Sequence, residues 1–220
     1  MTPRPLVQTL KSIIERSYGM PAVIGDLGPY IIGDAGYRTL YGGRDDPRAE
    51  VGSRLLIRHD GARVRAAVYY PDALVRHLER HNPLAGLTDV NIDAFAALVE
   101  ELDHLLTVAS RAAEGREVSV LELECHAAVT KYLLVLTLLG KLSGRRRLTE
   151  SQRRWARHHL FERYAAEPGG EQQRYRDAAL LARRYVEILE RLPVMRRPEE
   201  LRRFQRRSFA ENCRLVALYN

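Results

Sequence analysis

Two neighbouring predicted helices carry carboxylate and imidazole side chains at spacings that suit a metal ion. Glu101 and His104 form an E-x-x-H pair, which places an acid and an imidazole on one helical face. A di-iron bundle needs two such pairs and two further glutamates. The second helix offers Glu122-x-x-Cys125 in place of the second pair. Because half of the pattern is missing, the sequence predicts no metal site and no cofactor.

One hypothesis is that these helices form an enzymatic or metal-binding site from Glu100, His104, Glu122 and Glu124. It is the first alternative to the binding function predicted below. Glu124 and Lys131 lie in the most apolar helix of the chain, where burying either charge without a partner is costly. We therefore expect Glu124 to meet Lys131, His104 or an arginine. A buried ion pair that specifies packing is the favoured interpretation, and an acid/base group in a pocket is the other.

The strongest signal in the sequence is the uneven distribution of charge. Residues 141–220 hold 20 of the 35 Lys and Arg residues but only 10 of the 28 Asp and Glu residues, so this segment is net +10 and residues 1–140 are net −3. Most of the excess is arginine. The candidate anion-binding residues are Arg145, Arg146, Arg147, Arg153, Arg154, Arg157, Arg202, Arg203, Arg206 and Arg207.

Arginines repeat at i, i+4 spacing in two pairs, Arg202 with Arg206 and Arg203 with Arg207. Like charges at this spacing repel by a few tenths of a kcal/mol each, a cost that bound phosphate groups would offset. Arginine also suits bidentate contact with phosphate and stacking on bases. The alternative is that these arginines lie on solvated faces and pair in part with nearby glutamates.

The N-terminal part of the sequence predicts a small sheet with flanking helices. Apolar residues recur at helical spacing over 5–18, and a Gly-rich stretch over 24–36 predicts two tight turns between short strands. Asp60-Gly61, between two alternating runs within 55–70, predicts a β-hairpin. A further helix is expected from Pro71 to about residue 82.

The rest of the chain predicts helices, each marked by a cap or a breaker. Their expected ranges are 91–115, 119–140, 149–166, 171–192 and 198–218. The second should be the most buried, because apolar residues surround its axis. The fold class predicted is therefore α+β, with a small antiparallel sheet subdomain over 1–85 and a bundle of about five helices over 86–220.

Composition favours a soluble cytoplasmic protein. Cys125 and Cys213 fit neither a disulfide framework nor a metal-ligand spacing. The first 18 residues lack the apolar core of a signal peptide, and the longest apolar run, 133–139, is far short of the roughly 20 residues that a membrane span requires. We expect no membrane association.

These observations predict a binding or regulatory protein, more plausibly non-catalytic than enzymatic, whose Arg-rich C-terminal helices engage nucleic acid with little sequence specificity. A second alternative is a protein-interaction module that binds an acidic partner or self-associates through the apolar helix at 127–139. No motif specific to a characterised family occurs in the chain.

Overall fold

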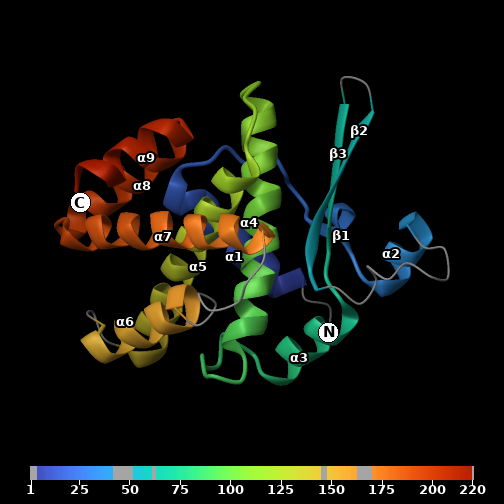
Figure 1. The fold of residues 1–220 in the computed structure, drawn as a ribbon. Helices are drawn as coiled ribbons and strands as arrows, with labels where there is room; N and C mark the ends of the chain where they lie inside the picture. The colour runs from blue at the N-terminus through green and yellow to red at the C-terminus, as the bar shows by residue number, and fades with distance from the viewer. Residues whose placement is uncertain (1–3, 42–51, 61–62, 145–147, 163–169, 220) are drawn as a thin grey trace.

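The computed structural model describes residues 4–41, 52–60, 63–144, 148–162 and 170–219. It is an α+β protein in which a small three-stranded sheet accompanies a mostly helical body, so the predicted fold class is confirmed (Figure 1). The α-helices are α1 (Arg4–Tyr18), α2 (Asp34–Tyr41), α3 (Asp72–Arg80), α4 (Ile92–Ala113), α5 (Val120–Ser143), α6 (Glu150–Arg157), α7 (Gly170–Arg191), α8 (Arg197–Arg206) and α9 (Phe209–Leu218). The shorter turns are the 3-10 helices η1 (Gly28–Tyr30) and η4 (Val194–Arg196) and the π-helical turn η3 (His158–Glu162).

The sheet is built on the predicted hairpin. Strands β2 (Arg54–Asp60) and β3 (Arg63–Tyr69) pair antiparallel, and Figure 1 shows them projecting from the side of α4 that faces away from α8 and α9. A short strand, β1 (Ile31–Ile32), joins β3 in parallel, so the sheet is mixed and not purely antiparallel. The tip of the hairpin, residues 61–62, lies outside the described residues.

The second of the two Gly-rich turns predicted within 24–36 is the start of helix α2. Asp34 occupies the first turn of this helix, where a carboxylate is favourable. Its Oδ1 also accepts hydrogen bonds from the Tyr69 hydroxyl at 2.8 Å and from the backbone N–H of Asp72 at 3.2 Å. At the first repeat the N–H of Gly28 donates to Oδ1 of Asp26 in a local turn, but no described strand precedes it. Two tight turns between short strands are therefore not what the described residues form.

Helix α5 is the central helix, as predicted, and it runs beyond Gly140 to Ser143. It ends where Gly144 adopts a left-handed conformation (φ 61°), a common helix terminator. Among the described helices, α5 has the length and composition of a membrane span, with 67% of its most apolar window buried inside the protein. The core helix of a helical body has these same properties.

The predicted helix over 198–218 is divided into α8 and α9. The Ser208 side chain accepts a hydrogen bond from the N–H of Glu211, and the Glu211 carboxylate accepts from the N–H of Ser208, which completes a capping box. This cap starts a new helix after Arg207, whose backbone is extended. The expected end of the 149–166 helix lies outside the described residues beyond Glu162, but its Thr149 and Gln152 capping box is present.

Buried polar groups connect four helices at the centre of the molecule. Asp103 of α4, fully buried, accepts a hydrogen bond from Thr130 of α5 at 2.7 Å and another from the ring Nδ1–H of His126 at 2.7 Å. Because the Thr130 hydrogen goes to Asp103, the Tyr18 hydroxyl of α1 donates to Thr130, at 2.8 Å. The His126 Nε2 lies 2.9 Å from Oε1 of Gln205 on α8.

Helix α1 therefore packs within the helical body. One hydrophobic core includes Leu10 and Ile14 of α1 together with Leu102, Val135 and Tyr185 of the later helices. The division of the chain near residue 85 stays a prediction.

We expect Asp103→Ala to lower the free energy of unfolding by about 3–5 kcal/mol, because it leaves the buried His126 and Thr130 donors without an acceptor. Urea denaturation followed by circular dichroism measures the change. Asp177→Ala, at an exposed position on α7, is the control and should stay within about 0.5 kcal/mol of the parent. A loss below about 1 kcal/mol for Asp103→Ala would contradict the structural role of Asp103.

Candidate functional site

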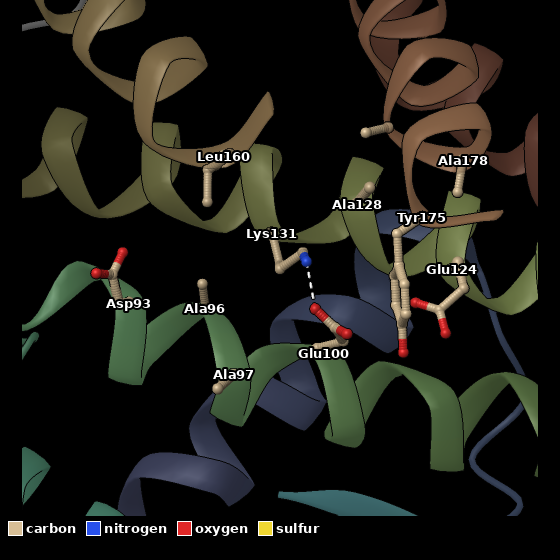
Figure 2. Close-up of a pocket in the computed structure, with 11 residues that line it drawn as sticks. Asp93, Ala96, Ala97, Glu100, Glu124, Ala128, Lys131, Leu160, Tyr175 and Ala178 are labelled. Atoms are coloured by element: carbon tan, nitrogen blue, oxygen red, sulfur yellow. Dashed lines mark hydrogen bonds and ion pairs between the residues drawn. The ribbon is translucent and has the colours of Figure 1, made fainter. Parts of the chain in front are cut away.

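A cavity of about 370 Å³ lies between α4, α5, η3 and α7 (Figure 2). Cavities of this size are typical of sites for small ligands. The residues that line it are Asp93, Ala96, Ala97, Glu100, Glu124, Ala128, Lys131, Leu160, Tyr175, Ala178 and Ala179.

Helical spacing and small side chains create this space. On α5, Glu124, Ala128 and Lys131 follow one another at i, i+4 and i+7, so all three lie on the same face of the helix. Helices α4 and α7 also present alanines to the cavity. Because alanine fills little volume, the helices leave a hollow between them.

An ion pair crosses the cavity. The Lys131 ammonium of α5 donates a hydrogen bond to the Glu100 carboxylate of α4, as Figure 2 shows. Burial alone would raise the pKa of Glu100, but the positive charges of Lys131 and His104 outweigh burial and lower it. Glu100 is therefore held as an anion by its partner.

Glu124 has a different environment. Its Oε2 lies 3.8 Å from the His104 Nε2, beyond hydrogen-bond distance, and among the described residues no donor reaches its carboxylate. Burial and the negative charge of Glu100 raise the pKa of Glu124 to about 7, although the positive charge of His104 opposes this shift. Glu124 is thus a carboxyl group that titrates near neutral pH inside a cavity.

His104 lies behind Glu124 and is almost fully buried. Its Nδ1 lies 3.5 Å from Glu101, and its Nε2 has no hydrogen-bond partner in the described part of the chain. Burial would lower the pKa of His104, but the hydrogen bond and charge of Glu101 and the charge of Glu124 outweigh burial and raise it. When protonated, His104 forms an ion pair with Glu124 from α4.

Tyr175 of α7 forms one wall of the cavity. Its side chain extends from α7 toward the Glu100 and Glu124 carboxyl groups (Figure 2). Burial and the charges of these two residues raise the pKa of Tyr175 to about 12, so the hydroxyl stays protonated and can donate a hydrogen bond. About half of the residue is exposed, at 46%, which places it between the cavity and solvent.

The structure brings together four of the five predicted candidates, Glu100, His104, Glu124 and Lys131, and confirms that Glu124 meets His104. The fifth, Glu122, lies elsewhere. It accepts hydrogen bonds from Nε and Nη2 of the buried Arg111, at 3.2 and 3.0 Å. Glu122 therefore neutralises a buried arginine.

Within the described residues, no group of three or more His, Cys, Asp or Glu side chains is placed to hold a metal ion. The arrangement that does exist is a carboxyl group titrating near neutrality beside a Glu–Lys pair and a tyrosine hydroxyl. Such a set can bind a charged group or exchange a proton. Sequence reasoning missed Tyr175, because which α7 face meets α5 depends on tertiary packing.

The arginines of α6 are engaged within the protein. Glu190 of α7 accepts hydrogen bonds from Arg153, from Arg157 at 2.6 Å and from the Tyr132 hydroxyl at 2.9 Å. Burial would raise the pKa of Glu190, but the hydrogen bonds from Arg157 and Tyr132 outweigh burial and lower it. Arg157 also pairs with Glu150 at 3.1 Å. Arg153 and Arg157 therefore contribute to packing and little to an anion-binding surface.

The α8 arginines divide into two kinds. Arg203 pairs with Glu199, and Arg207 pairs with Glu200 at 2.6 Å. In contrast, Arg202 and Arg206 are exposed and form no ion pair with any described residue, as is also true of Arg154 on α6. The cluster Arg145, Arg146 and Arg147 lies outside the described residues.

Comparison of the chain with protein-family models, with curated proteins and with solved structures finds no match.

We expect Glu124→Gln to be more stable than the parent at pH 8, by on the order of 1 kcal/mol, with the difference vanishing toward pH 5. The folded-state pKa, about 7, is above the usual glutamate value of 4.5, so the folded state binds this proton more tightly than the unfolded chain does. The Glu124 carboxyl group therefore stabilises the fold at low pH, and this stabilisation is lost as the pH rises from 4.5 to about 7. Glutamine at this position does not titrate. Urea unfolding at both pH values measures the difference.

The control is Glu117→Gln, which removes an exposed carboxylate in the α4–α5 loop. Its stability difference from the parent should not depend on pH. A pH-independent difference for Glu124→Gln as well would show that Glu124 titrates normally.

Proposed function

We propose that the protein is a non-catalytic binding protein whose α8 surface engages nucleic acid or another polyanion with little sequence specificity. The segment 191–207 contains seven arginines and two glutamates. It covers the end of α7, the turn η4 and α8, and five of its arginines are exposed: Arg191, Arg196, Arg202, Arg203 and Arg206.

The observation that carries this proposal is the pair Arg202 and Arg206. They lie one turn apart on α8, both exposed, and no described carboxylate neutralises either of them. A Cβ added at Gly19 would lie 3.2 Å from Cγ of Arg202, so the aliphatic stem of Arg202 packs against the end of α1. Two positive charges thus share one exposed helical face, where their repulsion favours an anionic partner.

The β2–β3 hairpin offers further support. Arg58 and Arg65 are exposed and stand directly opposite each other in the register, on the same face of the hairpin as Arg54. A two-stranded ribbon that carries arginines fits the major groove of DNA. The hairpin is therefore a second basic element that a polyanion can contact.

A protein partner is the second candidate, on the evidence of the turn between α7 and α8. Val194 and Met195 of η4 are 67% and 89% exposed, and Arg191 and Arg196 flank them. Exposed apolar side chains beside cations suit an acidic protein surface. Self-association through 127–139 is less favoured, because Val129, Val135 and Leu138 are buried within the core.

A cytoplasmic location without membrane association is part of this proposal. Both cysteines, Cys125 and Cys213, are free thiols, which suits a reducing compartment.

We expect Arg202→Gln/Arg206→Gln to weaken binding of labelled DNA and RNA at low salt and to flatten the log–log salt dependence of affinity by about 2 units of slope, since each phosphate contact contributes about 0.9. Fluorescence anisotropy across a salt series measures both quantities. An unchanged slope would remove α8 from the binding surface.

The matched control is Arg76→Gln/Arg80→Gln. These arginines are also exposed and one turn apart, but on α3. The control removes the same two positive charges from the protein. If both variants lower the slope of the log–log salt dependence equally, binding depends on net charge and not on a defined surface at α8. Copurification of an acidic protein, with no nucleic-acid binding, would favour the second candidate.

A further inference from the structure

The cavity between α4, α5, η3 and α7 contains a carboxyl group whose hydrogen-bonding capacity the protein does not use. Glu124 faces this space, and no described residue donates a hydrogen bond to it. The buried His104 behind it also has an Nε2 without a hydrogen-bond partner. Buried polar groups are normally satisfied, so the unpartnered His104 Nε2 marks an unusual site, and the Glu124 carboxylate beside it is the group that a ligand or solvent in the cavity can reach.

The protein itself shows which chemistry the cavity accepts. The Lys131 side chain is an alkyl chain ending in an ammonium group, and it lies in the cavity with its Nζ bound to Glu100. Glu124 lies two turns of α5 away from Lys131 and offers a second carboxylate without an ammonium. An amine ligand would repeat at Glu124 the interaction that Lys131 makes at Glu100.

The remaining walls suit the body of such a ligand. Alanines from three helices and Leu160 provide an apolar lining. Tyr175 adds an aromatic ring beside the carboxyl groups, and aromatic faces attract alkylammonium ions. A ligand with a carboxylate would instead meet the negative charges of Glu100 and Glu124, and a neutral ligand would gain no charge interaction with Glu124.

We propose that this cavity binds an organic amine, with its ammonium group on the Glu124 carboxylate and its apolar chain along the alanine-lined wall. The bound ammonium lies beside Tyr175, while Lys131 stays paired with Glu100. This binding is independent of nucleic-acid binding at α8.

Binding depends on pH through Glu124. The charged or titratable groups that face it are Glu100, Glu101 and His104 from α4, Lys131 from α5 and Tyr175 from α7. Because the pKa of Glu124 is about 7, amine affinity falls about tenfold from pH 8 to pH 6 as the carboxylate takes up a proton. An alkylamine stays charged throughout this range.

Isothermal titration calorimetry of the full chain with hexylamine, hexan-1-ol and hexanoate tests the proposal at pH 8. We expect hexylamine to bind at least tenfold more tightly than the alcohol or the acid. Equal affinity for hexylamine and hexan-1-ol would overturn ammonium recognition. No binding of hexylamine at millimolar concentration would overturn the site itself.

Two substitutions locate the binding. Glu124→Gln should weaken hexylamine binding at least tenfold, whereas Glu117→Gln, an exposed control, should leave it unchanged. Ala96→Leu places a larger side chain in the cavity wall at a partly exposed position and should weaken hexylamine and hexan-1-ol alike. Native circular dichroism confirms that each variant is folded. Parent-like affinity in a folded Glu124→Gln variant would refute the assignment.

Discussion

The helical body depends on one buried carboxylate. Asp103 has no exposed surface, and it accepts hydrogen bonds from two residues of α5. Through those residues it fixes the positions of Tyr18 on α1 and Gln205 on α8, which are far apart in the sequence. Apolar packing alone tolerates sliding of helices, whereas buried hydrogen bonds are satisfied in few arrangements. Asp103 thus sets the register in which α4 and α5 meet.

That register determines what the other faces of α4 and α5 present. With Asp103 against α5, Glu100 reaches Lys131, and Glu124 is left opposite His104 without a hydrogen bond. The alanines on these helices then face a third helix across a gap. The buried polar centre and the hollow lined by small residues are therefore two results of the same packing of α4 against α5.

The sequence was informative wherever a local rule decides the structure. Hairpin turn chemistry, the Thr149 cap and the apolar surround of α5 predicted elements that the structure contains. The Ser208 cap was equally visible but was missed. The partners of the carboxylates were predictable only in part. Glu122 pairs with Arg111, and Glu190 pairs with the arginines of α6. These contacts join different helices, so no spacing along a single helix predicts them.

Exposed positive charge lies on two sides of α4. The sheet lies on one side of α4, and α8 and α9 lie on the other (Figure 1). Arg58 and Arg65 are exposed on the hairpin of this sheet, and Arg202 and Arg206 are exposed on α8. Glu150 and Glu190, in contrast, neutralise Arg153 and Arg157 of α6. The molecule therefore presents positive charge in more than one direction. A polyanion that approaches at low ionic strength is attracted from either side, so electrostatic attraction would speed the encounter without fixing a single orientation of the two molecules.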